Sequence, residues 1–316
     1  MYATVTFFIL IASLFVLWLS SDRVIIHATL LAQKLGVSNL FIGFFVLAVA
    51  TGLPELAIAL QAILANKPLL SAGNILGANF SDISLCLGLA ALLFGPIYTH
   101  TGDLKKQLTI LLLSSFVMAF VFIMGQLNQI IGVFLIGLYL LSAVWLFKTT
   151  VPLEEALENS QNALLNQTTI LRSAINLFLF LLLILLSSKI CVMSALSVAL
   201  QFKIPEYIIG VIIIGVGASL PELSVTIQSV KQKKYGLAIG NSLGSVFEQG
   251  ALILGILALG LSKPLSLVHL RYIAPFMFFA YGVIGYCLLI KRRVDRREGV
   301  LLLLAYVLFV FYSLWR

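Results

Sequence analysis

The chain has 316 residues, of which 61% are hydrophobic and only 10% are charged, and its mean hydropathy is +1.11. Because no water-soluble domain of this size can bury so much apolar surface, the composition excludes a soluble protein and predicts an integral membrane protein. The net charge of +8 is scattered between apolar runs instead of forming a basic patch, so we expect no nucleic-acid partner.

Apolar runs long enough to cross about 30 Å of hydrocarbon recur along the whole chain. They cover residues 3–20, 39–66, 69–98, 107–125 and 128–147 in the first half, and 169–200, 207–230, 236–262, 272–290 and 299–315 in the second half. The first run has no basic leading segment and no small-residue cleavage site, so we expect a retained helix and not a signal peptide. The pattern predicts an all-α integral membrane protein with ten transmembrane helices.

One long polar stretch, TTVPLEEALENSQNALLNQT at residues 149–168, divides these runs into two sets of five. We expect it to link a first membrane repeat, residues 1–148, to a second one, residues 169–316. Placing both termini outside a cell membrane puts this linker and most of the 20 basic residues on the cytoplasmic side, as the positive-inside rule requires. The basic run KRRVDRRE, residues 291–298, is then a cytoplasmic anchor, with an anionic-lipid site as the alternative.

The two halves are copies of one pattern. A shift of 167 positions (222 minus 55) aligns Ser20 with Ser187, Gly43 with Gly210, Pro54 with Pro221, Glu55 with Glu222, Asn74 with Asn241, Gly77 with Gly244 and Gly88 with Gly255. Because an odd number of membrane segments separates the copies, the second copy must enter the membrane from the opposite side. The sequence therefore predicts two inverted five-helix repeats, with a substrate site at broken helices near the midplane.

The break in each repeat is predicted at a proline. TGLPEL, residues 51–56, and ASLPEL, residues 218–223, occupy the same register of the two copies. Proline has no N–H, so Pro54 frees the carbonyl of Ala50, and Pro221 frees that of Gly217. A free carbonyl inside a bilayer is costly unless it lines a polar cavity or meets a cation.

Four acids lie inside apolar runs, namely Glu55, Asp82, Glu222 and Glu248, against a single internal base, Lys189, whose role stays open. Each charge at the bilayer centre costs about 2.5 to 3.5 kcal/mol, so protons or bound cations must relieve it. Oxygen ligands alone suit a hard cation such as Ca²⁺. The three cysteines lie in apolar runs without metal-binding spacing, and we expect no cofactor.

At this level of detail the motifs resemble a known family. TGLPELAIAL with AGNILGANFSD, and ASLPELSVTI with AIGNSLGSVFEQ, are similar to the two repeats of the cation/Ca²⁺ antiporter superfamily, especially its prokaryotic Na⁺/Ca²⁺ exchangers. The resemblance implies that Glu55 and Glu222 are the central cation ligands. It also implies hydroxyl ligands from Thr51, Ser219 and Ser245, flanking positions at Asp82 and Gln249, and backbone carbonyls near Ala50 and Gly217.

The chain departs from the family pattern at four positions. Gly52 and Ala78 stand where the first repeat has serine, Ala218 where the second has threonine, and Val246 where the second has asparagine. Sodium sites in the family use such hydroxyls, so the resemblance leaves the coupling ion open between Na⁺ and H⁺. Glu248 adds an acid beside Gln249, and three roles remain for it: proton carrier, replacement for a displaced ligand, or partner at a helix interface.

We therefore expect a secondary antiporter that exchanges Ca²⁺ for Na⁺ by alternating access, in which the first helix of each repeat slides against the rest. A Ca²⁺/H⁺ or other cation/H⁺ antiporter is the alternative, and a non-transporting protein derived from an exchanger is a more distant one. The expected partners are Ca²⁺, monovalent cations and the lipid bilayer. The chain is not expected to be an enzyme, and its sequence leaves stoichiometry and oligomeric state open.

Overall fold

The computed structural model describes residues 2–35, 39–64, 66, 68–99, 101–148, 169–201 and 219–315. The linker at 149–168 and the first part of the predicted seventh segment, including Gly217, lie outside the described residues. The first-half helices are α1 (Tyr2–Leu35), α2 (Asn39–Ile42), the π-helical turn η1 (Gly43–Leu47), α3 (Ala48–Thr51), α4 (Leu53–Leu64), α5 (Pro68–Ser81), the π-helical turn η2 (Asp82–Leu87), α6 (Gly88–Phe94), α7 (Thr101–Met124) and α8 (Gln129–Lys148).

The second half repeats this order of helices. They are α10 (Ile170–Gln201), α13 (Leu220–Lys231), α14 (Tyr235–Phe247), the π-helical turn η5 (Glu248–Ile253), α15 (Leu254–Leu259), the 3-10 turn η6 (Val268–Leu270), α16 (Ile273–Tyr286), the π-helical turn η7 (Cys287–Lys291) and α17 (Arg296–Trp315). The turns η2 and η5 both interrupt the long central helix of their repeat, one position apart in register. The internal repeat of the sequence is therefore also a repeat of local structure.

The predicted all-helical membrane class is confirmed. In the part of the chain that the structure describes, seven helices are long and apolar enough to cross a membrane, or up to eight if the bent pair Leu40–Thr51 and Leu53–Leu64 counts as one span. The predicted count of ten is not tested, because the seventh segment is only partly described and α17 begins with three charged residues. The first helix is longer than predicted, since α1 continues through Asp22 and Arg23 to Leu35.

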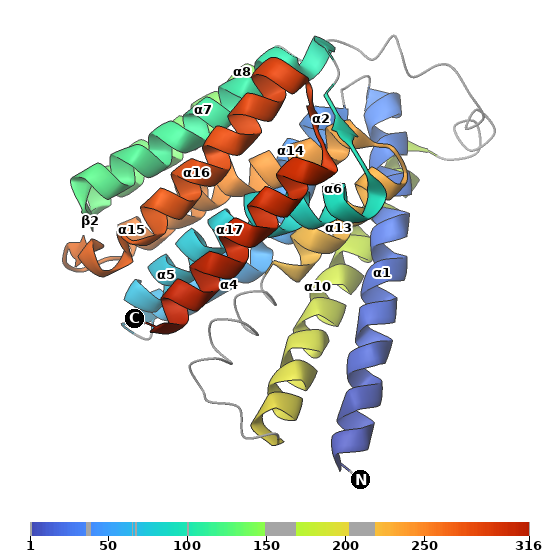
Figure 1. Cartoon of the computed structure of the whole chain (residues 1–316), viewed down its shortest axis with the longest axis horizontal. Coiled ribbons are helices and arrows are strands. Elements are labelled where there is room, and N and C mark those ends of the chain that lie inside the picture. The colour runs from blue at the N-terminus through green and yellow to red at the C-terminus, as the bar shows by residue number, and fades with distance from the viewer. Residues whose placement is uncertain are drawn as a thin grey trace.

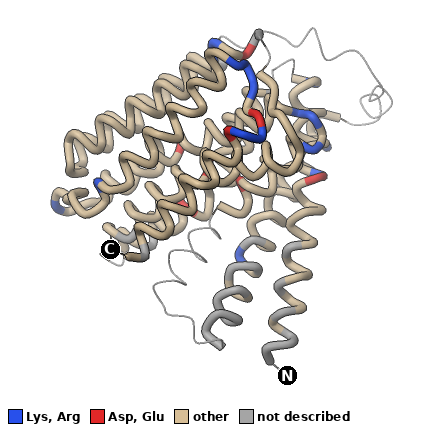
Figure 2. Tube along the Cα trace, in the orientation of Figure 1, with Lys and Arg blue, Asp and Glu red and all other residues tan. Residues whose placement is uncertain are grey.

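The helices form a main body and a separate pair. Helices α7, α8, α16 and α17 lie along one side of the main body, whereas α1 and α10 run side by side and project away from it (Figure 1). Basic residues lie at the end of the body where α16 meets α17, while some acidic residues lie inside the body (Figure 2). Within the described residues, the buried apolar side chains form two clusters, and the larger one contains no residue of α1 or α10.

The smaller cluster joins the α1–α10 pair to the body. Its members come from α1 and α10 and from the adjoining faces of α2, η1, α13 and α14: Leu17, Val24, Ile25, Ala28, Leu31, Ala32, Ile42, Leu47, Leu177, Leu181, Ile184, Val225 and Leu237. Polar contacts also join α1 to the body. Gln232 donates a hydrogen bond to the Asp22 carboxylate at 2.9 Å. The ammonium of Lys231 also lies 4.5 Å from the ring centroid of Trp18. Asp22 therefore lies within α1, half-buried and hydrogen-bonded to Gln232 at the end of α13.

Two short strand pairs tie the repeats together and are the only departure from a purely helical fold among the described residues. Strand β1 (Ile97–Tyr98) pairs with β4 (Arg293–Val294), and β2 (Gln126–Leu127) pairs with β3 (Leu265–Ser266), both antiparallel. Because β3 and β4 flank α16, the two pairs lie at opposite ends of that helix. Each pair joins a loop of one repeat to a loop of the other, so the halves are interlocked at both ends.

Close glycine crossings interlock the halves within the body. A Cβ added at Gly299 would lie 2.8 Å from the carbonyl oxygen of Gly88, and one added at Gly132 would lie 2.8 Å from that of Gly255. The shift of 167 positions converts the first crossing, α6 on α17, into the second, α15 on α8. Only a residue without a side chain permits these backbones to approach so closely.

Candidate cation-binding site

The helix that carries the Pro-Glu pair begins with the same backbone geometry in each repeat. Gly52 has φ −77° and ψ 0° and ends α3, while Ser219 has φ −86° and ψ 7° and precedes α13. The hydrogen bond from Leu56 N to Gly52 O measures 3.1 Å, and its counterpart from Leu223 N to Ser219 O measures 2.9 Å. The first break bends the chain by 41°. The predicted break in the first repeat is confirmed, and the new helix of the second repeat begins in the same way.

Glu55 and Glu222 occupy the first turns of α4 and α13. The N-terminal end of a helix carries a partial positive charge from its unpaired N–H groups, which favours a carboxylate in the first turn. Both side chains are fully buried, and none of their four carboxylate oxygens has a hydrogen-bond partner among the described residues. Buried, unpaired carboxylate oxygens are costly, so this arrangement favours a cation between the two breaks.

Asp82 and Gln249 lie on the symmetry axis between the repeats. The Gln249 side-chain amide donates to the Asp82 carboxylate at 2.8 Å, and the two residues are 167 positions apart. The Asn79 amide donates to the carbonyl of Val246 at 2.6 Å, again across 167 positions. When two symmetry-equivalent residues touch each other, the axis that relates the repeats must pass between them. The predicted flanking pair is thus central, on the axis itself.

The four buried acids lie close enough to interact with one another. Glu55 interacts electrostatically with Asp82, Glu222 interacts with both of them, and Glu248 interacts with Glu55 and Asp82. In the described part of the chain, the ion pairs all lie elsewhere, and Lys189 is exposed on α10 and joins none of them. The acids therefore form a buried cluster that has no basic partner among the described residues.

The three predicted hydroxyl ligands are fully buried. Thr51 donates its hydroxyl proton to the carbonyl of Leu47 at 2.9 Å, which leaves the lone pairs of its oxygen free to coordinate. The hydroxyl of Ser245 is buried and has no hydrogen-bond partner among the described residues, whereas the buried hydroxyl of Ser219 interacts with the Asp82 carboxylate. Ala50 lies in α3, half-buried, one residue before Thr51.

The acids alone do not form a closed metal site in this conformation. Within the described residues, no three His, Cys, Asp or Glu side chains converge closely enough to hold one metal ion. A hard cation such as Ca²⁺ takes six to eight oxygens, so hydroxyl, amide and carbonyl oxygens would have to complete its shell. Such a mixed oxygen set is the one that the sequence predicts.

Two hydrogen-bonding residues next to the site, Asn241 and Tyr281, were not predicted as part of it. Asn241 donates to the carbonyl of Glu222 at 3.3 Å and to the hydroxyl of Thr226 at 3.1 Å, so it fixes the first turn of α13. The Tyr281 hydroxyl donates to the Asn79 side chain at 2.7 Å and orients the amide that reaches Val246. The repetition of Asn74 at Asn241 was the one sequence signal for such supporting roles.

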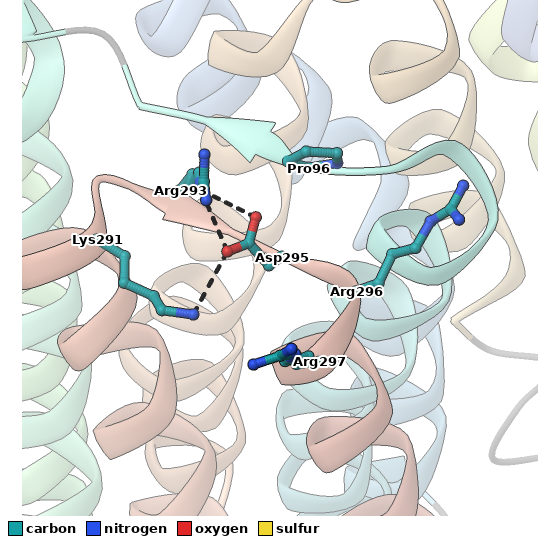
Figure 3. Close-up of a pocket in the computed structure, with 6 residues that line it drawn as sticks. All are labelled: Pro96, Lys291, Arg293, Asp295, Arg296 and Arg297. Atoms are coloured by element: carbon teal, nitrogen blue, oxygen red, sulfur yellow. Dashed lines mark hydrogen bonds and ion pairs between the residues drawn. The ribbon is translucent and has the colours of Figure 1, made fainter.

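A second polar region lies at the surface, where η7 leads into α17. A hollow of about 640 Å³ is lined there by Pro96, Lys291, Arg293, Asp295, Arg296 and Arg297 (Figure 3). Lys291 pairs with Glu298 at 2.6 Å, and Arg293 pairs with Asp295 at 2.9 Å. The acids within the basic run thus neutralise two of its bases, and this region is separate from the buried acids.

Comparison with known proteins identifies the family. The family described as "Sodium/calcium exchanger protein" matches the chain twice, over residues 5–148 and 172–315. These two matches correspond to the two repeats. The chain belongs to this family. It is therefore a multi-pass membrane transporter of the cation/Ca²⁺ exchanger family and not an enzyme.

Relatives and a solved structure cover nearly the whole chain. Inner membrane protein YrbG of Escherichia coli (strain K12) is 32% identical over 97% of this chain and 96% of its own length. Sodium/calcium exchanger MaX1 of Methanosarcina acetivorans is 29% identical over 97% of this chain and 98% of its own. The structure of the sodium-calcium exchanger NCX_Mj soaked with Na⁺ and Sr²⁺ superposes with a TM-score of 0.83 at 25% identity, covering 97% of each chain.

Proposed function

We propose that the protein is a secondary antiporter that exchanges Ca²⁺ for Na⁺ across the cell membrane. The observation that carries this proposal is the pair Glu55 and Glu222, which are fully buried with unpaired carboxylate oxygens in matching helix turns on the two sides of the axis. Thr51, Ser219, Ser245, Asp82 and Gln249, with carbonyls near Ala50 and Gly217, would supply further oxygens. One Ca²⁺ or several Na⁺ would satisfy the same carboxylates, so the two ions compete and exchange follows. MaX1 and NCX_Mj, both named sodium/calcium exchangers, support this assignment.

Alternating access would arise from movement of the α1–α10 pair. This pair has its own apolar cluster, distinct from the larger cluster of the body. Sliding two helices along the body disturbs fewer packed side chains than rearranging the body itself. The breaks at Gly52 and Ser219 would remain fixed while the pair opens the site to one side and then to the other.

A Ca²⁺/H⁺ antiporter is the alternative, favoured by one observation. Gly52 carries no hydroxyl, and the neighbouring acid Glu248 is buried close to Glu55 and Asp82. Proteoliposomes separate the two functions when ⁴⁵Ca²⁺ uptake is driven first by a Na⁺ gradient at equal pH and then by a pH gradient without Na⁺. We expect the Na⁺ gradient to drive uptake. Uptake that only the pH gradient drives would establish the alternative. If neither gradient drove uptake, a non-transporting protein would be favoured.

The same assay tests the site directly. Because glutamine keeps the shape of glutamate and removes its charge, Glu55→Gln and Glu222→Gln should each reduce ⁴⁵Ca²⁺ uptake to background while the protein still elutes as a single peak. Glu298→Gln, which neutralises an acid in the surface region, is the control and should retain uptake. Near-normal uptake by either site variant would overturn the ligand assignment.

We further propose that both termini lie outside and that residues 149–168 form a cytoplasmic linker between the repeats 1–148 and 169–316. The concentration of basic residues at the α16–α17 end of the body supports this orientation (Figure 2). A cysteine introduced at exposed Arg293 in β4 should then react with a membrane-impermeant maleimide only from the cytoplasmic side. A cysteine at exposed Ser266 in β3 should react only from outside. The reverse labelling would invert the topology.

A further inference from the structure

The carboxylate of Glu248 occupies the space beside Gly52. A Cβ added at residue 52 would overlap the Oε2 atom of Glu248 and lie 3.0 Å from its carboxyl carbon. Glu248 is only 2% exposed, and its Oε2 atom has no hydrogen-bond partner among the described residues. The two residues are far apart in sequence and belong to different repeats. An unpaired buried carboxylate oxygen thus lies at the helix break that precedes Glu55.

The equivalent positions in the other half of the molecule carry no acid. The shift of 167 positions relates Gly52 to Ser219 and Glu248 to Ser81. The aromatic neighbours also correspond, because Tyr139 interacts with Glu248 and its equivalent Tyr306 hydrogen-bonds with Ser81. The two residues in contact here, Gly52 and Glu248, therefore both have serine at their equivalent positions in the other half. The acid fills the space that the missing side chain at residue 52 leaves open.

We infer that Glu248 is a cation ligand that replaces the hydroxyl of residue 52, and that it makes the site selective for divalent over monovalent cations. The inference rests on the proposed function, because it assigns a role within the same site. Glu248 has no ion-pair partner among the described residues, so an interface pairing with a base does not explain its burial. Its nearest charged neighbours are acids, which only a cation between them would relieve.

The charge of the ligand gives the expected selectivity. A carboxylate attracts a divalent cation with twice the Coulomb energy that it gives a monovalent cation at the same distance, whereas a hydroxyl carries no net charge. Glu248→Gln should therefore weaken Ca²⁺ binding about thirtyfold, which corresponds to about 2 kcal/mol. Half of that energy predicts a loss of about fivefold for Na⁺.

Calorimetry on the purified full chain measures both effects, through direct Ca²⁺ titration and through competition by Na⁺. Glu298→Gln is the control and should bind both ions like the wild type. Equal Ca²⁺ affinity of Glu248→Gln and wild type would overturn the inference while leaving the proposed function intact. Absence of Ca²⁺ binding by the wild type would overturn the proposed function itself.

The contact with Gly52 gives a second, independent readout. In the wild-type background, Gly52→Ser should displace the carboxylate and weaken Ca²⁺ binding. In a Glu248→Ser background, the same change should strengthen Ca²⁺ binding, because the new hydroxyl enters an empty space and both positions then carry serine, as their equivalents do. The four variants form a double-mutant cycle, and opposite effects of Gly52→Ser on Ca²⁺ affinity in the two backgrounds cannot arise from a loss of folding. Effects of the same sign in both backgrounds would contradict the exchange of roles between the two residues.

Discussion

The crossing of α8 on α15 depends on two glycines, and its energy can be tested at one of them. A Cβ at residue 132 would lie 2.8 Å from the carbonyl oxygen of Gly255 and 3.0 Å from the backbone nitrogen of Leu259. Unstrained contacts of a carbon atom are about 3.5 Å or longer, so Gly132→Ala must separate the helices by several tenths of an ångström. Overpacking of this kind costs about 1 to 3 kcal/mol.

A second glycine in α8 isolates this cost from helix propensity. Gly137 belongs to the same helix, and a Cβ there would meet no heavy atom of the described residues within 4 Å. Gly137→Ala should therefore gain about 1 kcal/mol from the higher helix propensity of alanine. Gly132→Ala has the same gain, opposed by the overlap, so it should be less stable than Gly137→Ala by about 1 to 3 kcal/mol.

Unfolding of both variants by SDS titration in mixed micelles measures the difference. Gly299→Ala provides a replicate in the other half of the molecule, because its Cβ would lie at the same 2.8 Å from a carbonyl oxygen, that of Gly88. It should be destabilised, relative to Gly137→Ala, by a similar amount. If Gly132→Ala and Gly137→Ala were equally stable, the close crossing would not be rigid, and the reasoning from backbone overlap would fail.

Two hydrogen-bonded pairs give further predictions. Tyr281→Phe removes the donor to the Asn79 side chain. Because a buried acceptor left unpaired costs about 1 to 3 kcal/mol, this variant should be less stable by that amount in the same titration. Unchanged stability would show that water or another donor replaces the tyrosine. Ser21 and Ser224 join α1 to α13 with their hydroxyl oxygens 2.5 Å apart, so cysteines at both positions, in a background without the native cysteines, should form a disulfide that stops transport until it is reduced. Transport by a fully cross-linked protein would show that α1 does not slide along α13.

Local chemistry explains which parts of the site could be predicted from the sequence. The break in the first repeat follows from Pro54, whose missing N–H group acts within one helical turn. The burial of Glu55 and Glu222 follows from their place inside apolar runs, and their symmetry follows from a constant shift along the chain. Each of these inferences needs only residues that are close in sequence or equivalent in register.

The features that could not be predicted depend on how distant segments cross. The contact between Gly52 and Glu248 requires α14 and η5 of one repeat to pass the break of the other. Val246 departs from the family pattern in its side chain, yet its backbone carbonyl accepts the hydrogen bond from Asn79, and backbone groups leave no trace in sequence. The helical continuation of α1 past Asp22 was missed because the end of an apolar run marks the limit of the hydrocarbon and not that of the helix.

The axis of an inverted repeat also explains why the two copies differ at Asp82 and Gln249, where they meet. Away from the axis, identical residues have separate environments, so Glu55 and Glu222 can both be acids. At the axis, equivalent residues touch, and two carboxylates at the 2.8 Å that separates Asp82 from Gln249 would repel each other or share a proton. An amide opposite a carboxylate instead forms a hydrogen bond and leaves the carboxylate its charge. The amide of Asn79 meets a backbone carbonyl, that of Val246, so this second contact on the axis does not depend on the side chain at position 246.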